Sequence, residues 1–195
     1  MAIEHRLRQA VQRPPARLEE EAPRAAVAAI VDARGDLLLM RRAEHPDDPW
    51  SGHLSFPGGR VEPSDVDSLA AAIRETSEEI GFDLSPDQLI GPLDDLTTRP
   101  VRRHLIIEPF VFFVPEPGPF QLNEEVQSLH RVQLDALLTG VGRTQFPLSW
   151  KGETIELPCV DVDGLRLWGL TLRMVDDLLH RIDGRGVGLG RPTPE

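Results

Sequence analysis

Three residue types are almost missing from this sequence of 195 residues, which contains one cysteine, one lysine and no tyrosine. The lone Cys159 excludes an internal disulfide bond and a thiolate metal cluster. Long apolar runs are missing too, because none approaches the ~20 residues that a membrane-spanning helix needs. The first residues, MAIEHRLRQAVQR, lack the continuous apolar stretch of a secretory signal. We therefore expect a cytoplasmic protein with no membrane partner.

Basic charge is scarce as well. Lys and Arg number 21 against 32 Asp and Glu, which gives a formal net charge of −11. This balance argues against a general nucleic-acid binder, because such proteins neutralise phosphates with Lys and Arg. It does not exclude a small phosphorylated substrate, since a bound cation can reverse the local field.

The length suits a single domain, which at this size hides roughly 70% of the surface of the unfolded chain. A composition of 40% hydrophobic and 27% charged residues is typical of a soluble globular protein. We expect an N-terminal extension over residues 1–24, one domain over residues 25–182, and a flexible tail rich in Gly and Pro over residues 183–195.

Hydrophobic periodicity predicts strands mixed with helices, and hence an α/β or α+β sandwich. The expected helices span residues 3–12, 68–80 and 168–182. The expected strands are a pair around a turn at residues 33–36, then residues 88–97 and 105–114. Residues 124–139 are expected to mix a short strand with a helical turn, and residues 45–60 to form a loop.

Residues 68–80, SLAAAIRETSEEI, are the strongest predicted helix. Ser64, Asp65 and Asp67 are candidates for its N-cap, and Gly81 stands where a left-handed C-terminal cap belongs. Its carboxylates carry the chemical signal, and their spacing places them on one face of the helix.

Glu75, Glu78 and Glu79 repel one another there, and the helix dipole disfavours negative charge near the C-terminal end. A divalent cation relieves both penalties, because Mg²⁺ and Mn²⁺ prefer carboxylate oxygens. Upstream, the turn expected at Gly58-Gly59 lets backbone approach the same place closely. The alternative interpretation is a solvated acidic face.

This combination resembles the Nudix box, the signature of hydrolases that cleave nucleoside diphosphates linked to another moiety. The matching positions are Gly59, Arg74, Glu75, Glu78, Glu79, Gly81 and Phe82. The chain departs from the pattern in three ways. The interval from Gly59 to Arg74 is one residue longer, Thr76 stands at a usually apolar position, and Asp65 or Asp67 must replace the first Glu.

Several features look like the coenzyme A pyrophosphatase branch of that family. They are the longer interval, the segments SFPGGRVEPSD and AAIRETSEEIG, and the tetrapeptide Trp168-Gly169-Leu170-Thr171. The upstream element of the branch is represented by Leu38, Leu39, Arg41, Arg42 and Gly52. Asp48 stands where the branch has a basic residue.

The resemblance implies a Nudix fold, a mixed β-sheet sandwiched between α-helices. It also implies that Mg²⁺ or Mn²⁺ is held by Glu75, Glu78 and Glu79, with the carbonyl of Gly59 completing the shell. Glu79 is then catalytic, and Arg74 orients the carboxylates.

Outside the box, the resemblance suggests a further Glu as general base or extra ligand. Glu125 is the first choice and Glu124 the second, and ordinary loop solvation is the alternative for both. The expected substrate-binding residues are Arg41, Arg99, Arg102, Arg103 and Trp50. The alternative for the loop arginines is a solvated surface, and for Trp50 an anchor to the core.

The resemblance implies a small-molecule nucleotide substrate, and the expected reaction hydrolyses coenzyme A or an acyl derivative to 4′-phosphopantetheine and 3′,5′-ADP. The rivals are a Nudix hydrolase of ADP-ribose, nucleotide sugars or dinucleoside polyphosphates, and a catalytically silent nucleotide sensor. Members of the family are often dimers, but the sequence identifies no interface patch, substrate or number of metal ions.

Overall fold

The computed structural model describes residues 2–45, 51–98, 104–150 and 152–184. Its helices are α1 (Ile3–Ala10), α2 (Ser68–Ile80), the 3₁₀ turn η1 (Pro86–Gln88), α3 (Leu134–Leu138) and α4 (Gly169–Asp183). The strands of the main sheet are β1 (Arg24–Val31), β2 (Asp36–Arg42), β3 (Leu54–Ser55), β4 (Gly58–Arg60), β5 (Leu89–Pro92), β6 (Leu96–Thr97), β7 (Ile106–Phe113) and β8 (Val126–Gln133). A second sheet contains β9 (Arg143–Trp150), β10 (Glu153–Val162) and β11 (Leu165–Trp168).

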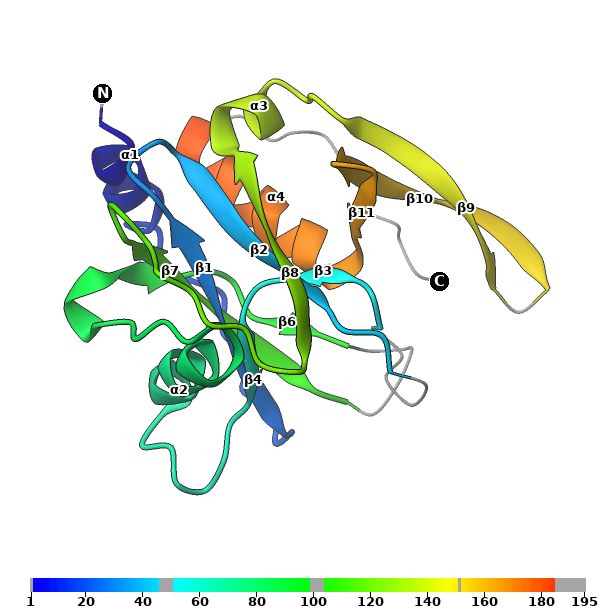
Figure 1. The fold of residues 1–195 in the computed structure, drawn as a ribbon. Helices are drawn as coiled ribbons and strands as arrows, with labels where there is room; N and C mark the ends of the chain where they lie inside the picture. The colour runs from blue at the N-terminus through cyan, green and yellow to red at the C-terminus, as the bar shows by residue number, and fades with distance from the viewer. Residues whose placement is uncertain (1, 46–50, 99–103, 151, 185–195) are drawn as a thin grey trace.

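The main sheet is mixed, with β1 at its centre (Figure 1). β1 pairs in parallel with β7 along its whole length and antiparallel with β2 and β4, while β8 pairs antiparallel with β2. A strand covered on both faces is expected to be apolar throughout, and the sequence of β1, RAAVAAIV, meets that requirement. The predicted α/β sandwich is therefore confirmed.

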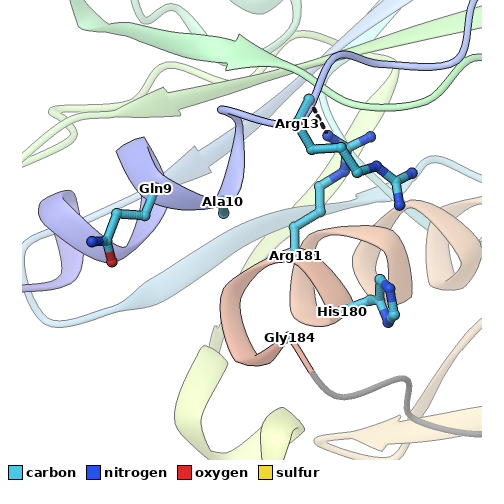
Figure 2. Close-up of a pocket in the computed structure, with 6 residues that line it drawn as sticks. All are labelled: Gln9, Ala10, Arg13, His180, Arg181 and Gly184. Carbon is cyan, nitrogen blue, oxygen red and sulfur yellow. Dashed lines mark hydrogen bonds between the residues drawn. The ribbon is translucent and has the colours of Figure 1, made fainter.

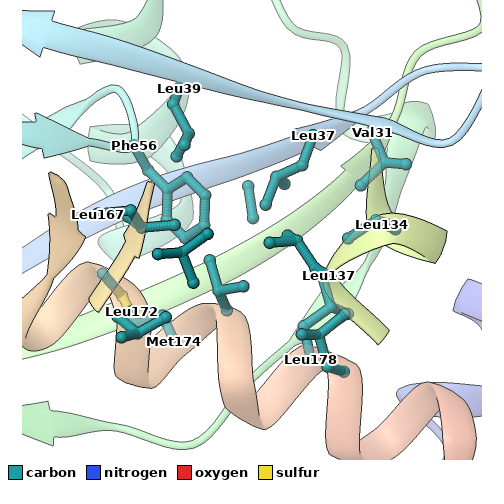
Figure 3. Close-up of a cluster of buried hydrophobic side chains, with 14 of the residues drawn as sticks. Val31, Leu37, Leu39, Phe56, Leu134, Leu137, Leu167, Leu172, Met174 and Leu178 are labelled. Carbon is teal, nitrogen blue, oxygen red and sulfur yellow. The ribbon is translucent and has the colours of Figure 1, made fainter. Parts of the chain in front are cut away.

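Two apolar cores lie on opposite faces of this sheet. One packs against α4 and contains Leu37 and Leu39 of β2 (Figure 3). The other packs against α2 and contains Leu38 and Met40. Side chains alternate along a strand, which predicts different faces for the neighbouring residues Arg41 and Arg42; the pairing of β2 with β8 is irregular between these two residues.

Helix α2 has the bounds that the sequence predicts. Asp67 is its N-cap and accepts a hydrogen bond from the Ala70 amide (2.8 Å), while Gly81 ends the helix in the left-handed conformation with φ 63°. Ala71 and Ala72 are fully buried, and their small side chains let the helix approach the sheet closely.

Two predictions fail in residues 45–60. The expected loop contains β3 and β4, and Gly58-Gly59 is a strand paired with β1 rather than a turn. This pairing is a tertiary effect that local turn propensity does not reveal. The approach is so close that a Cβ on Gly58 would overlap the Ala26 carbonyl oxygen and lie 2.6 Å from the Cα of Val27.

The sequence analysis placed no element in residues 143–168, where the second sheet forms. Pro147 lies in β9 and Pro158 in β10. Proline is depleted in strands because it cannot donate to the hydrogen-bond ladder, so these two residues hide the strand pattern.

The N-terminal segment packs on the end of α4. Leu7 of α1 is fully buried, and a cavity of about 200 Å³ lies between the two helices, with Arg13 and Arg181 in its lining (Figure 2). Arg13 pairs with Asp94 (2.6 Å), and Arg181 pairs with Asp177 (2.9 Å) and donates to the carbonyl of Arg13 (3.0 Å).

The division of the chain at residue 24 stays a prediction. The expected flexible tail lies, from residue 185 onward, outside the described residues. No helix in the described part of the chain is long and apolar enough to span a bilayer.

Gly58→Ala should destabilise the fold by more than about 3 kcal/mol, because the new Cβ overlaps backbone. Gly140→Ala is the matched control, since Gly140 also has a positive φ, of 81°, but nothing within 4 Å of the added Cβ. It should cost only the backbone strain, on the order of 1 kcal/mol. Urea unfolding measures both, and equal losses would contradict the overlap at β4.

Candidate active site

The site is built where α2 crosses β4, and Glu79 is its innermost acid. Glu79 is only 3% exposed, and its Oε2 accepts a hydrogen bond from the Gly58 amide (2.8 Å). The close approach of β4 therefore provides a hydrogen-bond donor to a carboxylate that α2 holds inside the protein. A buried carboxylate without such a donor would cost several kcal/mol.

The surroundings of Glu79 disfavour its ionised form. Burial, with smaller contributions from the negative charges of Glu75 and Glu125, raises the pKa of Glu79 to about 8. The Gly58 amide and the positive charge of Arg42 act in the opposite direction on this pKa. A bound proton or cation would offset the cost of burying the ionised Glu79 carboxylate near other acids.

Glu75 lies against the second glycine of the pair. A Cβ on Gly59 would come within 2.6 Å of Glu75 Oε2, so a side chain at position 59 would displace this carboxylate from its present place. Burial raises the pKa of Glu75, while hydrogen bonding to Arg74 opposes the shift. The two glycines therefore seat two different glutamates side by side.

Arg74 gathers the remaining acids. Its guanidinium donates to both oxygens of Asp65 (3.0 Å each), to Glu75 Oε1 (3.0 Å) and to Glu78 Oε2 (3.0 Å). Hydrogen bonds from Arg74 lower the pKa of Asp65. These contacts agree with an orienting role for Arg74, which stays a prediction.

The same contacts distinguish Asp65 from Asp67, the two candidates to replace the first Glu of the box. Asp65 faces Arg74 with both carboxylate oxygens, whereas the side chain of Asp67 caps α2. These contacts favour Asp65 over Asp67 as the replacement for the first Glu of the pattern, and that assignment stays a prediction.

A cavity of about 510 Å³ is connected to these acids through two of its lining residues, Arg42 and Glu125, whose charges act on Glu79. Its lining includes Arg42 from the end of β2, together with Glu124 and Glu125 from the segment before β8. The backbone joins these elements, since the Ala43 amide donates to the Glu125 carbonyl (2.7 Å). Of the two glutamates, Glu125 acts electrostatically on both Glu75 and Glu79. Its role as general base stays a prediction.

The sequence analysis named Arg41 for substrate binding and missed Arg42. Arg41 does not line the cavity; its Nε donates to the Gly52 carbonyl (3.4 Å) and its guanidinium pairs with Glu44 (3.3 Å), which does line it. Arg42 instead acts on Glu79. Strand alternation after Leu38 and Met40 was the signal that could have separated these two neighbours.

The other expected substrate-binding residues cannot be placed by the structure. Trp50, Arg99, Arg102 and Arg103 all lie outside the described residues.

The donor set suits a divalent cation. Within residues 2–45, 51–98, 104–150 and 152–184, no three His, Cys, Asp or Glu side chains form a ready cation cage, because Arg74 holds oxygens of Glu75 and Glu78. The side chain of Glu78 is 55% exposed and pairs with Arg74, and solvent leaves it room to turn towards a cation. Carboxylate oxygens beside a glycine backbone are ligands that Mg²⁺ and Mn²⁺ prefer. The residues therefore fit such an ion after a change of side-chain conformation.

Comparison with known proteins places this arrangement in a recognised group. The family model of the NUDIX domain matches residues 21–149. An uncharacterised Nudix hydrolase, NudL, from Yersinia pestis (strain Pestoides F) is 29% identical over 162 residues, which cover 82% of this chain and 79% of the relative. NudL from Yersinia pseudotuberculosis serotype O:1b (strain IP 31758) matches to the same extent.

Solved structures share the fold. The MutT protein of Methanosarcina mazei Go1 superimposes with a TM-score of 0.56 at 22% identity, over 86% of this chain and 97% of that one. A MutT/nudix protein of Enterococcus faecalis gives a TM-score of 0.55 at 18% identity, over 86% of this chain and 63% of that one.

Without added metal, Glu79→Gln should make the protein more stable than the wild type at alkaline pH. The folded wild type holds the Glu79 proton up to a pKa of about 8, against 4.5 for the model carboxyl. Its stability is therefore lost progressively as pH rises from the lower value to the higher. The advantage of the variant should grow by more than about 1 kcal/mol over this range.

Urea unfolding in the presence of a chelator, from about pH 5 to about pH 9, measures the difference. Glu78→Gln is the control, since this side chain is mostly exposed, and its difference from the wild type should stay flat. A flat profile for Glu79→Gln would show that burial does not perturb Glu79.

Proposed function

Since this chain belongs to the Nudix hydrolase family, whose members act on pyrophosphate bonds, we propose that it hydrolyses the diphosphate bond of coenzyme A or an acyl derivative. The products are then 4′-phosphopantetheine and 3′,5′-ADP. The observation that carries the proposal is the seat of Glu79 and Glu75 on Gly58-Gly59, next to the cavity that Arg42 and Glu125 line.

Nudix hydrolases generally use divalent metal ions, and here Mg²⁺ or Mn²⁺ is the proposed cofactor. Glu75, Glu78 and Glu79 would hold it, with the Gly59 carbonyl as a further ligand. When bound, such an ion neutralises charge on diphosphate oxygens and lowers the pKa of a water molecule.

The residues of the chain position the reaction. The Gly58 amide fixes the Glu79 carboxylate, and Arg74, itself held by Asp65, directs Glu75 and Glu78. The charge of Glu125, which lines the cavity, acts on Glu75 and Glu79, and its proposed role is to take the proton of the attacking water. Arg42 supplies the positive charge that a diphosphate entering an acidic site requires.

Coenzyme A is favoured by features of the sequence. The box interval is one residue longer than the general pattern, and Phe56-Pro57-Gly58-Gly59 and Trp168-Gly169-Leu170-Thr171 resemble the coenzyme A branch. Asp48, in place of a basic residue, instead favours ADP-ribose, a nucleotide sugar or a dinucleoside polyphosphate. It lies outside the described residues.

A substrate panel tests the proposal. The purified protein is incubated with Mg²⁺ or Mn²⁺ and coenzyme A, acetyl-coenzyme A, ADP-ribose, NADH or diadenosine polyphosphates, and the products are separated by chromatography. We expect the highest kcat/KM for coenzyme A or its acyl form, and a kcat about 10²–10⁴-fold lower for Glu79→Gln. Preference for another substrate would remove coenzyme A and keep the hydrolase. No hydrolysis of any member would leave the sensor alternative.

Arg42 and Arg41 form a matched pair for substrate binding. With the best substrate of the panel, Arg42→Gln should raise KM about tenfold or more, because a charged hydrogen bond to phosphate is lost. Arg41→Gln should leave KM within about twofold, since Arg41 does not line the cavity and its guanidinium is engaged by the Gly52 carbonyl and Glu44. Steady-state kinetics decide, and the reverse result would restore Arg41 as the substrate ligand.

A further inference from the structure

The β9–β10 ribbon projects from the body of the molecule. Figure 1 shows the two strands extending beyond the main sheet and its helices. Of the described strands, β9 pairs only with β10. A two-stranded ribbon is marginally stable by itself in water, so a ribbon that projects this far is expected to pack one of its faces against another surface.

One face of the ribbon is apolar. Leu148 stands opposite Ile155, and Phe146 stands opposite Leu157, and residues directly opposite each other share a face. The other face carries exposed polar residues and prolines, which are Gln145, Pro147, Ser149, Thr154, Glu156 and Pro158. This alternation is typical of a strand that packs one face against something.

Among the described residues, Trp168 covers the inner end of the apolar face. The ring of Trp168 contacts Phe146 edge-on at 5.1 Å and His53 at 5.0 Å, and Phe146 is 7% exposed. Farther out, Ile155 is 36% exposed. Leu148, Ile155 and Leu157 thus form an apolar strip along the outer part of the ribbon.

The two ends of the strip carry opposite charges. Glu153, at the outer end, is exposed and lies on the same face as Ile155. Arg166, at the inner end, is exposed and lies 5.0 Å from the centroid of the Phe146 ring. Asp161 stands opposite Arg166, but its carboxylate accepts from the Gly164 amide in the turn (3.2 Å).

We propose that the apolar strip binds the same strip of a second copy of this chain, in a two-fold dimer with the ribbons antiparallel. That arrangement buries Leu148, Ile155 and Leu157 of both copies and places each Glu153 over the Arg166 of the partner. A self-complementary patch of this kind is what a two-fold interface requires. Opposite local charges also offset the repulsion between two chains of net charge −11.

The face of the ribbon is used rather than its edge. Pro147 lies in the edge strand β9 and has no amide hydrogen to donate to an added strand. Sheets that pack face to face place their apolar side chains between them, about 10 Å apart. The dimer leaves the cavity beside Arg42 and Glu125 unchanged and does not depend on the substrate.

Sedimentation equilibrium on the full chain tests the proposal. The wild type should be a dimer that dissociates on dilution, and Leu148→Glu combined with Ile155→Glu should be monomeric. The control carries Ser149→Glu and Thr154→Glu, which add the same charges to the opposite face, and should remain dimeric. Circular dichroism checks that both variants fold.

Charge reversal tests the orientation with residues that are exposed. Glu153→Arg and Arg166→Glu should each raise the dimer dissociation constant about tenfold or more, about 1.4 kcal/mol. The two reversals combined should restore it, because each copy again presents opposite charges to the other. A monomeric wild type overturns the proposal, even if another molecule binds the strip. It is also overturned by a dimer that survives the two glutamates in the strip, or by reversals that do not compensate.

Discussion

The contact between the backbone of β4 and the carboxylates of α2 is the constraint on which the rest of the site depends. Gly58 provides the amide that Glu79 requires, and Gly59 leaves the space that Glu75 occupies. Neither acid would be tolerated there if the strand stood farther away, because a buried carboxylate needs donors or a cation. The alanines of β1 and α2 serve the same end, since small side chains bring helix and sheet together.

The negative charges of the site outnumber the positive charges that contact them. Arg74 is a single positive charge among Asp65, Glu75 and Glu78, and Glu79 is stabilised mainly by one amide. A structural protein would gain stability by replacing such acids with neutral residues. Their retention at the border of a cavity is typical of a site that trades stability for binding.

Much of this architecture could be predicted from the sequence because the signals are local. The bounds of α2 follow from Asp67, Gly81 and helical periodicity, and the acids were recognisable by their spacing. The pairing of Gly58-Gly59 with β1 and the strands around Pro147 were not, because they depend on partners distant in the chain. The sequence analysis also did not distinguish Arg41 from Arg42, because two adjacent residues of one type differ only in the surroundings that the fold gives them.

The packing of α1 on α4 joins the first and last helices of the described chain. The pairing of β1 with β7 likewise joins segments that are distant in the sequence. Contacts between such distant segments make loop closure costly and folding slow. Helix α1 therefore gains this packing partner only when α4 is in place. The ion pairs of Arg13 and Arg181 lie near that junction, and the hydrogen bond from Arg181 to the Arg13 carbonyl links the two ends of the described chain directly.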